Sequence, residues 1–159
     1  MNEQKNVLAH LLSEAAPARQ TERLLACNGD TVAYGLRLTP QQAQALEQTR
    51  QTALRETGRI ELDGGMTDKL IRAFCSSPYV TQETWEETLH ALLALFYAVK
   101  NELPDRMGDD AVLTCMRRAF DGPCRGSLEL LAGEAMPALI RRWNRRAAGP
   151  AERMEATDD

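Results

Sequence analysis

Residues 81–102 read TQETWEETLHALLALFYAVKNE, and this stretch decides the fold class. Thr81 can cap a helix start, and apolar residues then recur at spacings of three and four positions. They form one wide stripe: Trp85, Leu89, Leu92, Leu93, Phe96 and Val99. A stripe this broad needs cover from several neighbouring elements. We therefore predict a central helix around which the rest of the chain packs.

Start and stop signals predict further helices on both sides of this segment. Thr39-Pro40-Gln41-Gln42 combines a capping threonine, a proline in the first turn and a glutamine that can complete a capping box. Gly58 should end that helix. The other predicted helices are Asn2–Ala15, Ala18–Cys27 with a left-handed stop at Asn28-Gly29, Met66–Cys75, Asp109 or Asp110 to Phe120, and one from Ser127 that Pro137 should kink.

The predicted fold is all-α, an irregular bundle of about six or seven helices. Gly35–Leu38 and Arg59–Leu62 alternate in hydropathy and could pair as a minor two-stranded β element. Residues 1–146 form a single helical domain in this interpretation. Residues 147–159 are small, polar and acidic, which predicts a flexible C-terminal tail.

Composition and charge limit the classes of function. The 159 residues carry a net charge of -4, which disfavours a broad basic surface for nucleic acid. The longest apolar run, Ala91–Val99, is far shorter than the roughly 20 residues of a membrane span, and no signal peptide is evident. The four cysteines form no C-x-x-C pair. We expect a cytoplasmic protein with free thiols, no cofactor and no membrane contact.

Four segments resemble a known family. They are LTPQQAQALEQTRQTALRETGRIELDGG (Leu38–Gly65), LIRAFCSSPY (Leu70–Tyr79), LFYAVKNE (Leu95–Glu102) and FDGPCRGSLELLAG (Phe120–Gly133). Together they are similar to DUF6323, a bacterial family catalogued as a domain of unknown function. The resemblance implies a cytoplasmic bacterial protein, and it implies no activity.

The loop Gly122–Ser127 is one candidate site. Cys124 precedes a predicted helix start, whose positive dipole end, together with Arg125, would lower the pKa of the thiol. Cys124 and Ser127 also have the C-x-x-S spacing of a single-thiol redox site. The strand–helix alternation of thioredoxin-like domains is lacking, however. The alternative is a simple helix–helix connection in which Ser127 caps the last helix.

Arg50 and Arg59 form a second candidate site. Arg50 lies on the inward stripe of its helix, among Leu46, Ala53 and Leu54, and a buried guanidinium needs a carboxylate or several carbonyls. The simpler interpretation is a structural ion pair or a snorkelling side chain. The alternative is that Arg50 and Arg59 together line an anion pocket.

The remaining charged features favour structural interpretations. Residues 141–146, RRWNRR, complement the negative end of a helix dipole, although they could contact nucleic acid. Glu87 and His90 form half of a di-iron motif whose second half is missing, so we expect His90 to be hydrogen-bonded rather than a metal ligand. No complete catalytic motif is present. We therefore expect a non-enzymatic interaction or assembly protein that binds itself or another protein, with the Cys124 site and nucleic-acid binding as alternatives.

Overall fold

The computed structural model of the chain describes residues 19–61, 66–104 and 107–147, and these ranges are all-α with no strand. The predicted helix Asn2–Ala15 and residues 148–159 of the predicted tail lie outside them. The described elements are a helix over residues 19–26, α2 (Asn28–Thr31), η1 (Val32–Tyr34), α3 (Pro40–Thr57), α4 (Met66–Phe74), η2 (Gln82–Thr84), α5 (Trp85–Glu102), α6 (Asp109–Asp121), α7 (Leu128–Leu130), η3 (Leu131–Ala135) and α8 (Met136–Ala147).

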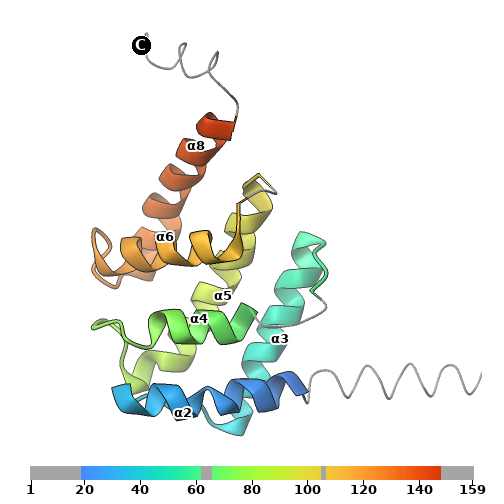
Figure 1. Cartoon of the computed structure of the whole chain (residues 1–159), viewed down its shortest axis with the longest axis vertical. Helices are drawn as coiled ribbons and strands as arrows, with labels where there is room; N and C mark the ends of the chain where they lie inside the picture. Colours follow the sequence, from blue (N-terminus) through green and yellow to red (C-terminus); the bar gives the residue numbers. More distant parts are fainter. Residues whose placement is uncertain (1–18, 62–65, 105–106, 148–159) are drawn as a thin grey trace, which may run out of the picture.

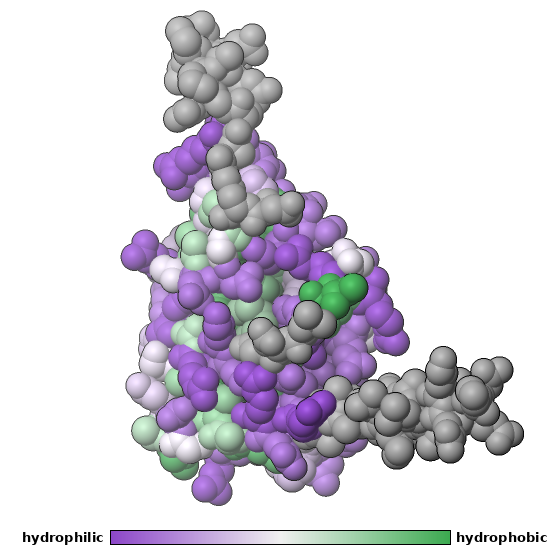
Figure 2. All heavy atoms as spheres, turned by 45° about the vertical axis from the view of Figure 1, so that its right-hand side comes forward, coloured by the Kyte–Doolittle hydropathy of each residue, from purple (hydrophilic) through white to green (hydrophobic). Residues whose placement is uncertain are grey.

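Helix α5 is the centre of the bundle, as predicted (Figure 1). It contacts α3, α4, α6, α7 and α8. Its whole predicted stripe is buried, and Tyr97 and Thr88 are buried beside it. Figure 2 shows the consequence on one face of the molecule, which is mostly hydrophilic with only small hydrophobic areas. No described helix is long and apolar enough to cross a lipid bilayer.

Helix α3 begins and ends where its local signals predict. The Gln42 amide donates to Thr39 Oγ1 at 3.1 Å, and the Thr39 amide donates to Gln42 Oε1 at 2.9 Å, which completes the capping box. Gly58 follows the helix with a φ of 67°, a left-handed conformation that glycine adopts without steric cost. The inward face of α3 packs on α5.

The predicted two-stranded β element is wrong for the residues that the structure describes. Gly35–Leu38 contains a turn and an extended segment, and residues 59–61 are irregular, but neither pairs as a strand. The backbone of the extended segment instead bonds to side chains on two different elements. Its hydrogen-bonding groups are therefore satisfied without a neighbouring strand.

Two carboxamide side chains make the backbone hydrogen bonds that a neighbouring strand would have made. Asn28 accepts from the Leu38 amide and donates to the Leu38 carbonyl, both at 2.9 Å. Gln82 makes the same two bonds with Arg37, at 2.7 and 3.0 Å. The predicted helix stop at Asn28-Gly29 is also wrong, because α2 begins at Asn28 and the left-handed residue is Gly35, with a φ of 75°. The side chain of Asn28 holds Leu38 instead.

The last helical segment starts at its predicted cap. Ser127 Oγ accepts from the Leu130 amide at 3.2 Å. The helix then passes through the π-helical turn η3 before α8. This irregular turn includes Gly133, four residues before Pro137, and the proline ring would clash with the carbonyl at that position in a regular α-helix.

Candidate binding sites

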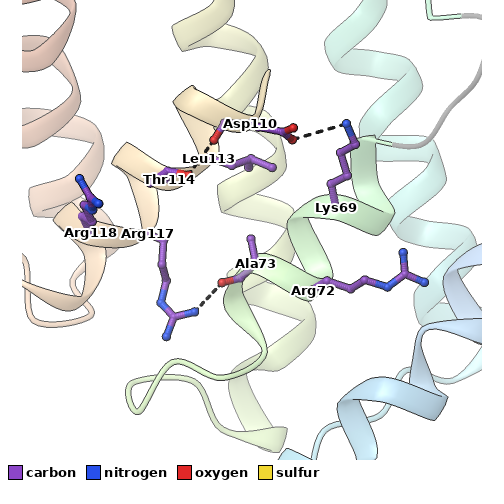
Figure 3. A pocket seen from close by; sticks show the side chains of 8 residues that line it. All are labelled: Lys69, Arg72, Ala73, Asp110, Leu113, Thr114, Arg117 and Arg118. Carbon is purple, nitrogen blue, oxygen red and sulfur yellow. Dashed lines mark hydrogen bonds and ion pairs between the residues drawn. The ribbon is translucent and has the colours of Figure 1, made fainter. Parts of the chain in front are cut away.

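A groove with a volume of about 650 Å³ lies between α4 and α6 (Figure 3). Eight residues line it: Lys69, Arg72, Ala73, Asp110, Leu113, Thr114, Arg117 and Arg118. The apolar side chains of Ala73 and Leu113 lie between two polar bridges, one at each end. The groove thus combines an apolar middle with a rim of four cations, three of which are paired with carboxylates.

The bridge at one end is a loose surface ion pair. Lys69 Nζ lies 3.5 Å from Asp110, and the two side chains are 53% and 84% exposed. Arg72 makes a similar pair, with its Nε 3.2 Å from a carboxylate oxygen of Asp30 on α2. Ion pairs this exposed stabilise a protein by at most about 1 kcal/mol. Lys69 and Arg72 can therefore exchange their partners for the carboxylates of a ligand.

The bridge at the other end is more firmly held. Arg117 reaches across from α6 to the carbonyl of Ala73 on α4, and its Nε lies 2.5 Å from Asp121. It also donates to Ser76 Oγ at 3.1 Å. The neighbouring Arg118 is exposed and makes no ion pair with the residues that the structure describes. Arg117 is thus structural, whereas Arg118 is a cation available to a partner.

Another hollow, of about 340 Å³, lies beside α3, and both Arg50 and Arg59 line it. Arg50 is also a structural ion pair. Its Nη1 lies 2.9 Å from Glu47 Oε1, and its Nε lies 3.1 Å from Glu61 Oε1. Tyr97 on α5 donates to the same Glu61 oxygen at 2.7 Å. The arginine that the sequence places in the core therefore pairs with two carboxylates rather than presenting a free charge.

Burial raises the pKa of one carboxylate in this cluster, that of Glu47. The side chains of Arg50 and Glu47 are 6% and 3% exposed, and that of Glu61 is 20% exposed. Loss of solvation raises the pKa of Glu47, against the opposing effect of Arg50. Sequence reasoning missed Glu47, although it lies three residues before Arg50 on the same inward face. Sequence reasoning could not find Glu61, because its contact with Arg50 depends on how the chain turns back toward α3 after that helix ends.

The structure opposes a reactive thiol at Cys124. The residue is only 3% exposed, and burial raises the pKa of its thiol, with Glu134 acting in the same direction. Arg125 is exposed and adopts a φ of 50°. The hydroxyl oxygen of Ser127 accepts the hydrogen bond that caps the following helix. The helix that follows, α7, has three residues before it changes to a π-turn. The loop is thus a helix–helix connection, the alternative interpretation of the sequence.

The remaining charged features do not line the groove between α4 and α6 or the hollow that contains Arg50. Arg141, Arg142, Arg145 and Arg146 are exposed along α8, so the contact with nucleic acid that they could make stays a prediction. His90 bonds to Thr49 Oγ1 at 2.7 Å and to Glu86 Oε2 at 3.2 Å, which engages both ring nitrogens. The described residues include no group of three or more His, Cys, Asp or Glu side chains that could hold a metal.

Comparison with known proteins agrees with the resemblance of the four segments. A family model for DUF6323, described as a family of unknown function, matches residues 23–149. A search of curated proteins and a search of solved structures found no match. The matched range includes α2 to α8 and every residue that lines the groove between α4 and α6. The chain therefore belongs to the DUF6323 family.

Proposed function

We propose that this protein is a cytoplasmic interaction protein whose groove between α4 and α6 binds an acidic segment of a partner protein. The observation that supports this proposal most strongly is the composition of the groove. Four cations and one carboxylate surround the apolar side chains of Ala73 and Leu113. The four cysteines of the chain are free thiols, as is usual in a reducing compartment.

The rim favours an anionic partner on grounds of charge. Lys69 and Arg72 form only exposed ion pairs, and Arg118 forms none with the described residues. A partner carboxylate can replace Asp110 beside Lys69 without leaving a buried charge unpaired. Each such contact is open to solvent, so it contributes more to specificity and association rate than to affinity.

The middle of the groove favours a polypeptide over a nucleic acid. Ala73 and Leu113 offer apolar contact to the side chains of a bound segment, whereas the outer surface of a nucleic-acid duplex presents mainly charged phosphates. The net charge of -4 also repels a long polyanion. A short acidic segment with apolar side chains on one face satisfies both parts of the groove.

The test is site-specific photo-crosslinking in the native cell. A photoreactive amino acid replaces Thr114, which is exposed within the groove, and in a matched control it replaces Ala138, which is exposed on α8. We expect an adduct from position 114 whose crosslinked peptide is rich in Asp and Glu. The same peptide, made synthetically, should then bind the purified protein.

Charge reversal distinguishes a groove contact from a general attraction. Lys69→Glu combined with Arg118→Glu should remove the adduct and weaken peptide binding by tenfold or more. Arg141→Glu with Arg145→Glu makes the same change of charge on α8 and should alter neither. An adduct to nucleic acid, an adduct to a peptide without acidic residues, or equal loss in both double variants would overturn the proposal.

A further inference from the structure

The outward face of α8 carries four arginines that the groove between α4 and α6 does not use. All are exposed, and none forms an ion pair with a residue that the structure describes: Arg141, Arg142, Arg145 and Arg146. At 3.6 residues per turn they lie within roughly 140° of the helix circumference. Residues 136–147 contain no acidic side chain. We call this side of α8 the arginine face, and it concentrates positive charge on a chain whose net charge is -4.

The dipole of α8 explains only half of these arginines. Arg145 and Arg146 lie in the last turn of the helix, where a cation compensates the free carbonyl groups. The dipole effect falls off within that turn, so it gives no reason for Arg141 and Arg142. Like charges four positions apart on a helix also repel one another, which destabilises it. An anionic partner would remove that repulsion.

A fifth arginine extends this cationic surface onto α6. Burial raises the pKa of the Cys115 thiol, and the charges of Arg118 and Arg142 oppose that rise. Both guanidinium groups therefore lie near Cys115, one on α6 and the other on α8. Arg118 is exposed, like the arginines of α8. The cationic surface thus spans two helices.

The arginine face is held on a firm support. Leu139, Ile140 and Trp143, on the other side of α8, are half-buried against the core. Asn144 Nδ2 donates to the carbonyl of Glu102, at the end of α5, at 3.2 Å. Figure 1 shows that the last turns of α8 extend beyond the other described helices. The arginines therefore lie on a single helix that projects from the bundle.

The inward position of the apolar side chains opposes two kinds of anionic partner. A helix that binds a lipid surface needs a free apolar face, and that of α8 packs on the core. An acidic peptide would find no exposed large apolar side chain on α8, in contrast to the apolar middle of the groove between α4 and α6. The arginine face thus fits a partner that it can bind through charge alone.

The shape of α8 then favours duplex DNA among the nucleic acids. Single strands bind proteins by stacking their bases on aromatic side chains, and Trp143, the one aromatic residue of α8, is half-buried. The major groove of B-form DNA, about 12 Å wide, admits one α-helix. The major groove of an RNA duplex is too narrow for side chains to read.

We propose that the arginine face of α8 binds the phosphates of duplex DNA without preference for sequence. The helix lies in the major groove, and its arginines pair with phosphates along the edges of that groove. The net charge of -4 weakens attraction at long range, but contacts within a Debye length, about 10 Å at 0.1 M salt, depend on the local charge. Because Arg118 also lines the groove between α4 and α6, the variants of the test leave it unchanged.

The test measures binding of the full-length protein to a fluorescein-labelled DNA duplex by fluorescence anisotropy. Two duplexes with the same composition and scrambled sequences are titrated between about 50 and 200 mM NaCl. We expect equal affinities for both. The logarithm of the association constant should fall with the logarithm of the salt concentration with a slope of about -3.6 for four phosphate contacts, roughly a hundredfold loss over this range. A single strand, polyglutamate and phosphatidylserine vesicles should bind more weakly than the duplex.

Two double variants connect the binding to α8. Arg142→Gln with Arg146→Gln should make the salt slope shallower by about 1.8, because two phosphate contacts are lost. The melting temperature should not fall, since both side chains are exposed. The matched control Arg37→Gln with Arg55→Gln removes the same charge from exposed arginines outside α6 and α8, and should leave the slope unchanged.

Photo-crosslinking in the native cell places the contact on the protein. A photoreactive amino acid in place of Ala138, which is exposed on α8, should give an adduct with DNA. The same amino acid in place of Thr114 should give none. An adduct with DNA at position 138 and an acidic peptide at position 114 would support the two proposals separately, and either can fail without the other.

Several results would contradict DNA binding by the arginine face. One is an unchanged anisotropy at about 50 mM NaCl with 100 μM protein, the weak end of non-specific affinities. Others are an equal salt slope in Arg142→Gln with Arg146→Gln and the unmodified protein, or tighter binding to the single strand, polyglutamate or vesicles than to the duplex. Binding that appears only after the acidic side chains of residues 152–159 are changed to amides would assign the arginine face to that segment of the same chain instead.

Discussion

Replacing Asn28 by Ala should destabilise the protein much more than replacing Gln82 by Ala, although the two side chains make the same pair of hydrogen bonds. Asn28 bonds to the amide and carbonyl of Leu38, which is only 4% exposed. Gln82 bonds to those of Arg37, which is exposed. Water can replace the Gln82 carboxamide after truncation but reaches the backbone of Leu38 poorly.

The expected magnitudes follow from this difference in burial. Leaving two largely buried backbone groups unsatisfied costs about 2–4 kcal/mol. Alanine is a better helix former than asparagine by roughly 0.6 kcal/mol, which offsets part of that loss because Asn28 lies in α2. We expect a net loss of about 1.5–3.5 kcal/mol for Asn28→Ala, and less than about 1 kcal/mol for Gln82→Ala.

Urea denaturation followed by far-ultraviolet circular dichroism measures both values, and thermal melts provide a check. At about 2–4 °C per kcal/mol for a chain of this size, Asn28→Ala should lower the melting temperature by roughly 3–14 °C. An equal loss of unfolding free energy in the two variants, or a larger loss for Gln82→Ala, would refute the claim that burial decides how much these hydrogen bonds stabilise the protein. An unchanged m-value is required for the comparison to hold.

Three further predictions follow from the buried cluster and the loop before α7. Arg50→Met should cost about 3–5 kcal/mol in urea denaturation, because it leaves two carboxylates unpaired, and adding Glu47→Leu should restore part of that loss. Gly126→Ala should cost about 2–4 kcal/mol, because the new Cβ would lie 2.5 Å from Tyr79 Cβ at a φ of 81°, and the cost should fall when Tyr79 is replaced by Gly in a double-mutant cycle. Burial raises the pKa of the Cys124 thiol, so its alkylation by iodoacetamide should have a higher pH midpoint in the native protein than in urea; a lower native midpoint would restore the hypothesis of a reactive thiol.

Local signals in the sequence were sufficient for most of the helices. The capping box of Thr39 and Gln42 and the stop at Gly58 involve residues a few positions apart, whose geometry the helix itself sets. The apolar stripe from Trp85 to Val99 identified the central helix for the same reason. Where local signals failed, a distant contact was responsible.

The segment Gly35–Leu38 shows that failure most clearly. Its alternating pattern indicates extended backbone, and residues 36–39 are indeed non-helical, but the pattern does not say what bonds to that backbone. The partners turned out to be carboxamides ten and forty-five positions away. The same limit applied to Asn28, which resembles a helix stop in sequence and serves as a bridge in the structure.

The sequence by itself determined that this chain is helical, which helix is central, where α3 begins and ends, and that Arg50 needs a carboxylate or several carbonyls. These properties depend on residues within one or two turns of each other, or on the cost of burying a charge, and both can be judged along the chain. Only the tertiary structure decided that Glu61 and Tyr97 join Arg50, that Gln20 faces the same hollow, and that Lys69 and Arg118 share a groove. Those pairings depend on how helices far apart in sequence pack around α5, and the helical period alone does not specify that packing.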